Sequence, residues 1–140
     1  MKSIHILACL VLSTVNTAWA SLTVKVDEPK LTGNKAVIKL TMTSTFTNKI
    51  ESARAVAFLL DDNGKAVGQS AQWVIGGSKD RPALEANKET PYFFVVPLDN
   101  SSPSSGTNSI KAKVTFLRVI LEGGKQVDAA KEVRVTQVKN

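Results

Sequence analysis

The stretch Ile-Lys-Leu-Thr-Met-Thr at residues 38–43 alternates strictly between apolar and polar side chains. Successive side chains of a β-strand point to opposite faces, so this period of two places Ile38, Leu40 and Met42 on one face. The intervening lysine and threonines lie on the other face, and the Gly33-Asn34 pair before the stretch is typical of a turn. The stretch therefore predicts a β-strand with one dry and one wet face.

The same period recurs along the chain, and no long stripe with the 3.6-residue period of a helix competes with it. Further strands are expected where apolar alternation is bounded by turn residues, at residues 22–26, 53–60, 65–75, 92–96, 110–121 and 127–138. About seven strands at these spacings predict an all-β fold, an immunoglobulin-like antiparallel β-sandwich.

Three local features refine this prediction. Asn63-Gly64 between two strand-like runs predicts a β-hairpin, because both residues tolerate a positive φ. The apolar block at residues 92–96, fenced by two prolines, predicts a strand covered on both faces. A slip in the alternation near Phe116-Leu117 predicts a β-bulge in the first of two C-terminal strands, which residues 122–125 join.

Residues 1–20 have the features of a secretory signal peptide in the right order. Lys2 precedes an apolar stretch over residues 4–15, and Ala18 and Ala20 are small residues at the alternate positions that signal peptidase favours. The apolar stretch is shorter than the about 20 residues that cross a bilayer, so we expect no membrane span. Cleavage would leave residues 21–140 as a single domain exported to the periplasm or secreted.

The one cysteine of the chain, Cys9, and its one histidine, His5, both lie in this leader. Without them the domain has neither a thiol nucleophile nor an imidazole base, which disfavours zinc and copper sites and Ser-His hydrolysis. A hydrolase that uses two carboxylates stays open as a third hypothesis, because that chemistry needs only two acids at a set separation. We expect a protein that is not an enzyme and holds no metal or other cofactor.

One part of the chain resembles a known family. Residues 58–64, Phe-Leu-Leu-Asp-Asp-Asn-Gly, are followed by Leu84-Glu85-Ala86-Asn87 and an aromatic strand. This order is similar to that of the FxLYD family of small immunoglobulin-like envelope domains, over about residues 36–96 of this chain. The resemblance implies an immunoglobulin-like envelope domain. The shared positions shape a hairpin and a core, so it implies no site residues.

The turn Asp61-Asp62-Asn63 offers hard oxygen ligands beside a glycine, which is one part of a calcium loop. A complete loop needs further spaced ligands and a bidentate glutamate, whereas Lys65, Ala66 and Val67 follow here. The same residues serve the geometry of an ordinary hairpin tip, and we expect that role.

Basic residues form the first candidate binding surface. The chain has 18 Lys and Arg against 12 Asp and Glu, a net charge of +6 that falls to +5 when Lys2 leaves. Lys111 and Lys113 lie two apart on one strand face, with Arg118 further along. They would bind an anionic partner through salt-sensitive electrostatics, or would simply form a wet sheet face. Aromatic residues do not alternate with them, so we expect no nucleic acid.

Trp73 and an alanine strip are the other candidates. Trp73 is the one tryptophan outside the leader, and an exposed indole would stack on a sugar ring. The neighbouring Val74 and Ile75 favour burial in the core. Ala53, Ala55 and Ala57 form a flat strip that either packs inside the fold or leaves a docking surface, and we expect packing inside.

The function expected from these features is that of an exported, non-catalytic protein-interaction or binding module of the cell envelope. The expected partner is an envelope or extracellular protein. The alternative is a module that binds an anionic polymer or a carbohydrate through the basic strand face or Trp73. Because sandwiches host unrelated activities, this step rests on analogy with the fold.

Overall fold

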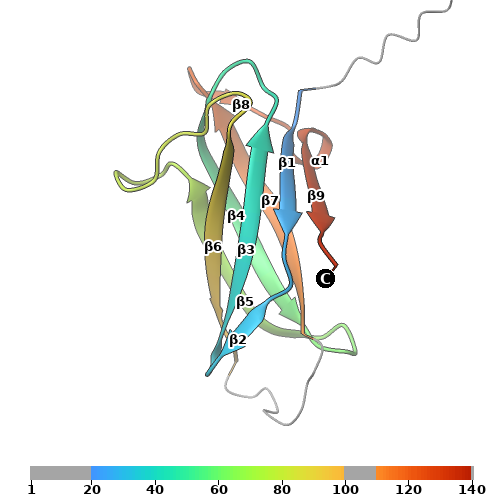
Figure 1. Cartoon of the computed structure of the whole chain (residues 1–140). Coiled ribbons are helices and arrows are strands. Elements are labelled where there is room, and N and C mark those ends of the chain that lie inside the picture. The colour runs from blue at the N-terminus through green and yellow to red at the C-terminus, as the bar shows by residue number, and fades with distance from the viewer. Residues whose placement is uncertain (1–19, 100–109, 140) are drawn as a thin grey trace, which may run out of the picture.

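The computed structural model describes residues 20–99 and 110–139, and the predicted signal peptide lies outside this range except for Ala20. The strands, with one helical turn, are Leu22–Val26 (β1), Lys30–Thr32 (β2), Lys35–Ser44 (β3), Ile50–Leu60 (β4), Ala66–Ile75 (β5), Glu89–Pro97 (β6), Lys111–Leu121 (β7), Lys125–Gln126 (β8), Ala129–Glu132 (α1) and Val133–Gln137 (β9). Figure 1 shows them as two layers.

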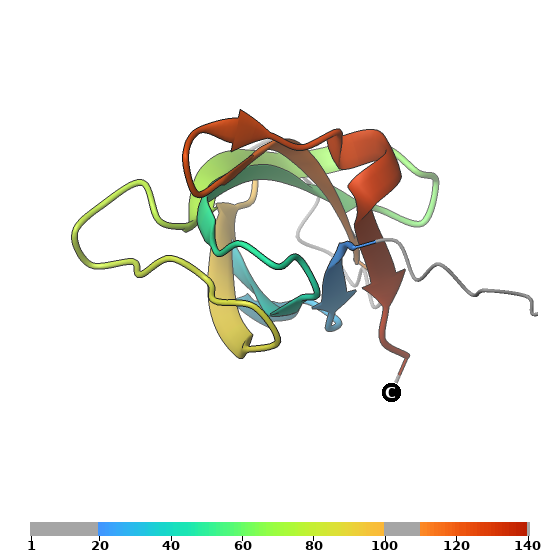
Figure 2. The same ribbon diagram turned by 90° about the horizontal axis from the view of Figure 1, so that it is seen from above.

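Two sheets pack face to face (Figures 1 and 2). In the first sheet, β3 pairs with β6 along one edge and with β2 and β1 along the other, and β9 joins β1. The second sheet has the order β5-β4-β7-β8. The prediction of an immunoglobulin-like sandwich of about seven strands is confirmed, because seven strands of the described residues have five residues or more.

The buried core is formed by the apolar residues of the alternating pattern in the sequence. Ile38, Leu40 and Met42 are fully buried, whereas Lys39 on the opposite face is exposed. Burying one such side chain contributes about 1.5–3 kcal/mol, so β3 alone supplies a large share of the stabilising energy. The inward-facing residues of both sheets form one hydrophobic cluster.

The alanine strip of β4 packs inside, as the sequence predicts. Ala53, Ala55 and Ala57 are fully buried, together with Leu59. The facing sheet contributes large buried side chains, among them Phe94, and small residues on β4 leave room for them. The bulky side chains that alternate with the alanines, Val56 and Phe58, point outward.

The predicted hairpin joins β4 to β5. The Asp61 carboxylate oxygen Oδ1 accepts hydrogen bonds from the backbone N–H groups of Asn63 and Lys65, both at 2.9 Å. Gly64 has a φ of 78°, the left-handed conformation that glycine adopts at no steric cost. Asp61 thus serves the geometry of the turn.

Two predicted strands differ in the structure. Residues 92–96 are covered on one face only, because Phe94 and Val96 point into the core while Phe93 and Val95 are 58% and 41% exposed. No third layer covers the outer face of the first sheet within the described residues (Figure 2). A run of apolar residues does not by itself reveal how many of its faces are covered.

The strand expected at residues 127–138 is shorter than predicted, because Ala129–Glu132 form a helical turn and the strand is limited to Val133–Gln137. After the short β8, Asp128 accepts a 3.0 Å hydrogen bond from the N–H of Ala130, and its own N–H donates to Glu132 at 2.9 Å. This reciprocal cap starts the helical turn α1. The chain then enters the first sheet, where β9 pairs in parallel with β1.

Candidate binding surface

The outer face of the second sheet brings together apolar and cationic side chains from β4, β5 and β7. On β4, Phe58 lies opposite Lys113 and Leu60 lies opposite Lys111, whereas Arg54 lies between Arg118 and Trp73. We call this surface the cationic face and define it by Arg54, Val56, Phe58, Leu60, Trp73, Lys111, Lys113, Leu117 and Arg118.

The bulge in β7 enlarges this surface. The register of β7 against β4 shifts between Arg54 and Ala55, where Phe116 and Arg118 are paired and Leu117 is the extra residue. The predicted bulge is therefore confirmed. It turns two successive side chains outward, because Leu117 is 53% exposed and Arg118 is also exposed.

The cations of the cationic face outnumber the acids on their own strands. The strands β4, β5 and β7 contain four cations, Arg54, Lys111, Lys113 and Arg118, and one acid, Glu51 at the start of β4. Within the described residues, an ion pair is found between Lys49 and Glu122, whose charged atoms are 3.9 Å apart. Both residues lie outside β4, β5 and β7. The face therefore carries a positive potential, which falls off over about 8 Å at physiological salt.

Apolar side chains run along the middle of these charges. Val56, Phe58 and Leu60 are half-buried between the flanking strands. Long lysine side chains can lay their methylene stems over such residues and keep the ammonium group in water. The face thus offers apolar contact area with a cationic border on its β7 side.

Trp73 lies on this face and not in the core, so the predicted burial is wrong. The Arg54 guanidinium carbon is 5.5 Å from the centroid of the half-buried indole. The indole also packs directly against Gly77, which has a φ of 78°. A Cβ atom on Gly77 would lie 2.7 Å from the indole Cγ, so the contact leaves no room for a larger residue. Val74 and Ile75 are buried as expected, but the strand alternation turns Trp73 to the other side.

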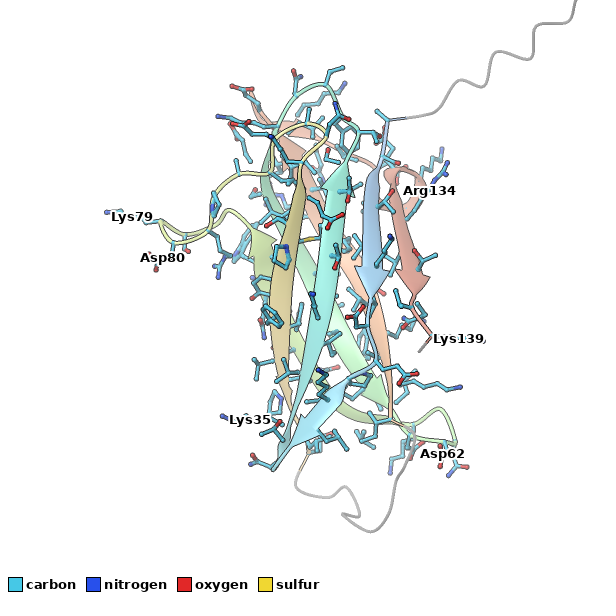
Figure 3. All side chains as sticks on the ribbon, viewed as in Figure 1. Lys35, Asp62, Lys79, Asp80, Arg134 and Lys139 are labelled. Atoms are coloured by element: carbon cyan, nitrogen blue, oxygen red, sulfur yellow. The ribbon has the colours of Figure 1, made fainter. Side chains whose placement is uncertain are left out.

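The structure gathers the three predicted basic residues, Lys111, Lys113 and Arg118, on β7. A further cation, Arg134, belongs to β9 in the first sheet, where it pairs with Thr23 (Figure 3). The sequence analysis missed Arg54 and Phe58. Their signal is the β4 alternation, in which the alanines face inward and their neighbours face outward.

The loop after β5 stands away from this surface, whereas the acidic turn directly follows Leu60 at one end of it. Figure 3 shows Asp62 at one end of the sandwich, and Lys79 and Asp80 at the tip of a projecting loop. The described residues contain no group of three or more His, Cys, Asp or Glu side chains that could hold a metal ion. None of their helices is long and apolar enough to cross a membrane.

Comparison with known proteins identifies a shared architecture. No protein-family model and no curated protein matches this chain. A Bordetella pertussis protein assigned as ApaA superposes with a TM-score of 0.51 at 17% identity, covering 77% of this chain and 85% of its own. IrmA from Escherichia coli superposes with a TM-score of 0.51 at 11% identity, covering 86% of this chain and 95% of its own. They share the fold.

Proposed function

We propose that this chain is an exported, non-catalytic interaction module of the cell envelope whose cationic face takes a protein partner. The observation that carries the proposal is the pairing of apolar side chains with four cations, against which the same strands place one acid, Glu51. Such a face favours a partner that presents both acidic and apolar side chains, because each kind of group then finds its complement.

The apolar part favours a protein over a polyanion. An anionic polymer would neutralise Lys111 and Lys113 but would leave Leu117, which is 53% exposed, in water. A carbohydrate would need an open indole, whereas Trp73 already lies against Arg54 and Gly77. Export itself rests on the features of residues 1–20.

A capture experiment tests the proposal. Tagged protein comprising residues 21–140 is incubated with native envelope extract, washed at low and at high salt, and the retained material is identified by mass spectrometry. The face variant is Leu117→Ser with Lys113→Gln. The matched control is Leu31→Ser with Lys39→Gln, which changes a leucine of similar exposure and an exposed lysine of the first sheet.

The proposal expects one discrete protein that survives the high-salt wash on the wild type and on the control, and that the face variant loses. Recovery of polyanions or of many acidic proteins, all released by salt, contradicts it and favours the anion-binding alternative. Equal retention by both variants also contradicts it.

A further inference from the structure

The strand β7 has one paired edge and one open edge. The Ala112 carbonyl accepts a 2.8 Å hydrogen bond from Gln137 Nε2, and the Val119 carbonyl accepts one at 3.0 Å from the N–H of Val127. Both partners lie on the side away from β4. Because backbone groups alternate between the two edges of a strand, the N–H and C=O groups of Val114 and Phe116 also point to that side.

No strand of the described residues pairs with this edge from Ala112 to Phe116. The strand β8 pairs only with Ile120 and Leu121, after which α1 carries the chain over to β1 in the first sheet. Figure 2 shows β9 beside β1, with which it pairs. Within the described residues, the Gln137 amide is the one group that hydrogen bonds to this stretch of edge.

An open strand edge is a template for β-augmentation, in which an extended peptide adds a strand and gains main-chain hydrogen bonds. The side chains of the added strand would alternate between the two faces of the sheet. On the outer face they would lie beside Lys111, Lys113 and Thr115. On the inner face they would lie beside Ala112, Val114 and Phe116.

We propose that an extended segment of a partner protein, in which acidic residues alternate with apolar ones, pairs with β7 between Ala112 and Phe116. Acidic side chains complement the two lysines across the new strand pair, and apolar ones extend the buried face. This inference rests on the proposed function and specifies the class of partner. A second copy fits less well, because the chain has a net charge of +6.

Because the proposed contact is made by main-chain groups, a single proline substitution can test it. Val114→Pro removes one N–H from the open edge and leaves the hydrogen bonds to β4 intact, since proline is tolerated where the N–H of an edge strand faces solvent. The control at another edge is Val95→Pro, because the Val95 carbonyl accepts from Gln72 and so marks the edge of β6 that faces away from β3, although the Val95 side chain is exposed and that of Val114 is buried. Circular dichroism tests whether each variant folds.

The probe is a fluorescein-labelled ten-residue peptide in which glutamate alternates with valine. Its control has the same composition, with the five glutamates grouped before the five valines. Fluorescence anisotropy gives the dissociation constant for the wild type, for both proline variants, for Lys111→Gln with Lys113→Gln, and for Lys25→Gln with Lys39→Gln. The last pair changes two exposed lysines on the outer face of the first sheet.

The inference expects the alternating peptide to bind and the grouped peptide to bind at least about tenfold more weakly. Val114→Pro should weaken binding about tenfold or more, from the lost main-chain contact. Loss of Lys111 and Lys113 should weaken it about three- to tenfold, whereas Val95→Pro and the first-sheet lysine pair should leave it unchanged. Equal binding of both peptides, or unchanged binding by a folded Val114→Pro, overturns the inference.

A second measurement covers the case in which Val114→Pro does not fold. Amide exchange of the wild type, followed by NMR, should show the N–H groups of Val114 and Phe116 becoming protected when the alternating peptide binds. Binding that depends on Lys111 and Lys113 without this protection overturns strand addition but leaves the cationic face as the proposed binding site. The two proposals can therefore fail separately.

Discussion

The two sheets of the sandwich are joined by more hydrogen bonds along one side than along the other. Between β5 and β6, Gln72 Nε2 donates to the Val95 carbonyl at 2.8 Å, the Tyr92 hydroxyl donates to Gln72 Oε1 at 2.8 Å, and the Asp99 N–H donates to the Val67 carbonyl at 2.8 Å. Between β7 and β9, the one hydrogen bond found among residues 20–99 and 110–139 is that from the Gln137 amide to the Ala112 carbonyl on the edge of β7.

Prolines add to the difference. The Val95 carbonyl faces Gln72, so the strand alternation directs Pro91 and Pro97 to the same edge of β6, where neither offers an N–H. The edge of β7 carries no proline and keeps its donors. Natural sheets use proline to prevent strand addition at an edge. The comparison therefore indicates that the edge of β6 is closed to strand addition, whereas the edge of β7 keeps backbone N–H groups that the proposed strand addition would use.

The largest effect is expected from Gly68→Val on the side of β5 and β6. A Cβ atom at Gly68 would lie 2.6 Å from the Pro97 carbonyl oxygen and 3.2 Å from Leu59 Cδ1. Because the first neighbour is backbone, β5 and β6 must separate, and we expect a loss of about 2 kcal/mol or more in the free energy of unfolding. Urea denaturation measures it, with Ala66→Val at an exposed position of β5 as the control.

A smaller difference is expected between the two bridging glutamines. Gln72→Ala removes hydrogen bonds to Val95 and Tyr92 and should cost about 1–3 kcal/mol. Gln137→Ala removes one bond of an exposed side chain and should cost about 0.5 kcal/mol or less. Equal losses in parallel denaturation curves would mean that the two sides are joined equally strongly.

The smallest effect concerns binding and has the opposite sign. Gln137→Ala frees the Ala112 carbonyl, which an added strand would otherwise have to take from the glutamine. We expect the alternating peptide to bind about twofold to fivefold more tightly, the gain that one weak competing hydrogen bond allows. Weaker binding in the anisotropy assay would show that Gln137 contacts the peptide instead of competing with it.

The strand alternation predicts most of the fold but not the partner of each strand. The period of two at residues 38–43 separates the buried face of β3 from its wet face. The same period on β4 separates alanines from bulky residues, and the packing of the facing sheet decides which set is buried. Sequence spacing also gives no sign that Val133–Gln137 pairs with Leu22–Val26, more than a hundred residues earlier.

The candidate site also depends on strand pairing that the sequence does not predict. Lys111, Lys113 and Arg118 are visible in the sequence as one strand face, and the structure keeps them together. Arg54 and Trp73 join them only because β4 lies between β5 and β7, which depends on long-range pairing. The open edge depends on where β8 ends. The cap at Asp128, which starts α1, is the local signal that marks this point.

Hydrogen exchange of the free protein, residues 21–140, tests the open edge of β7 most directly. Backbone amides that point to β4, those of Lys113 and Thr115, are paired within the sheet and should exchange slowly. Those of Val114 and Phe116 should exchange rapidly, giving an alternating pattern along one strand. Equal protection of all four amides would show that this edge is already covered and would contradict the account.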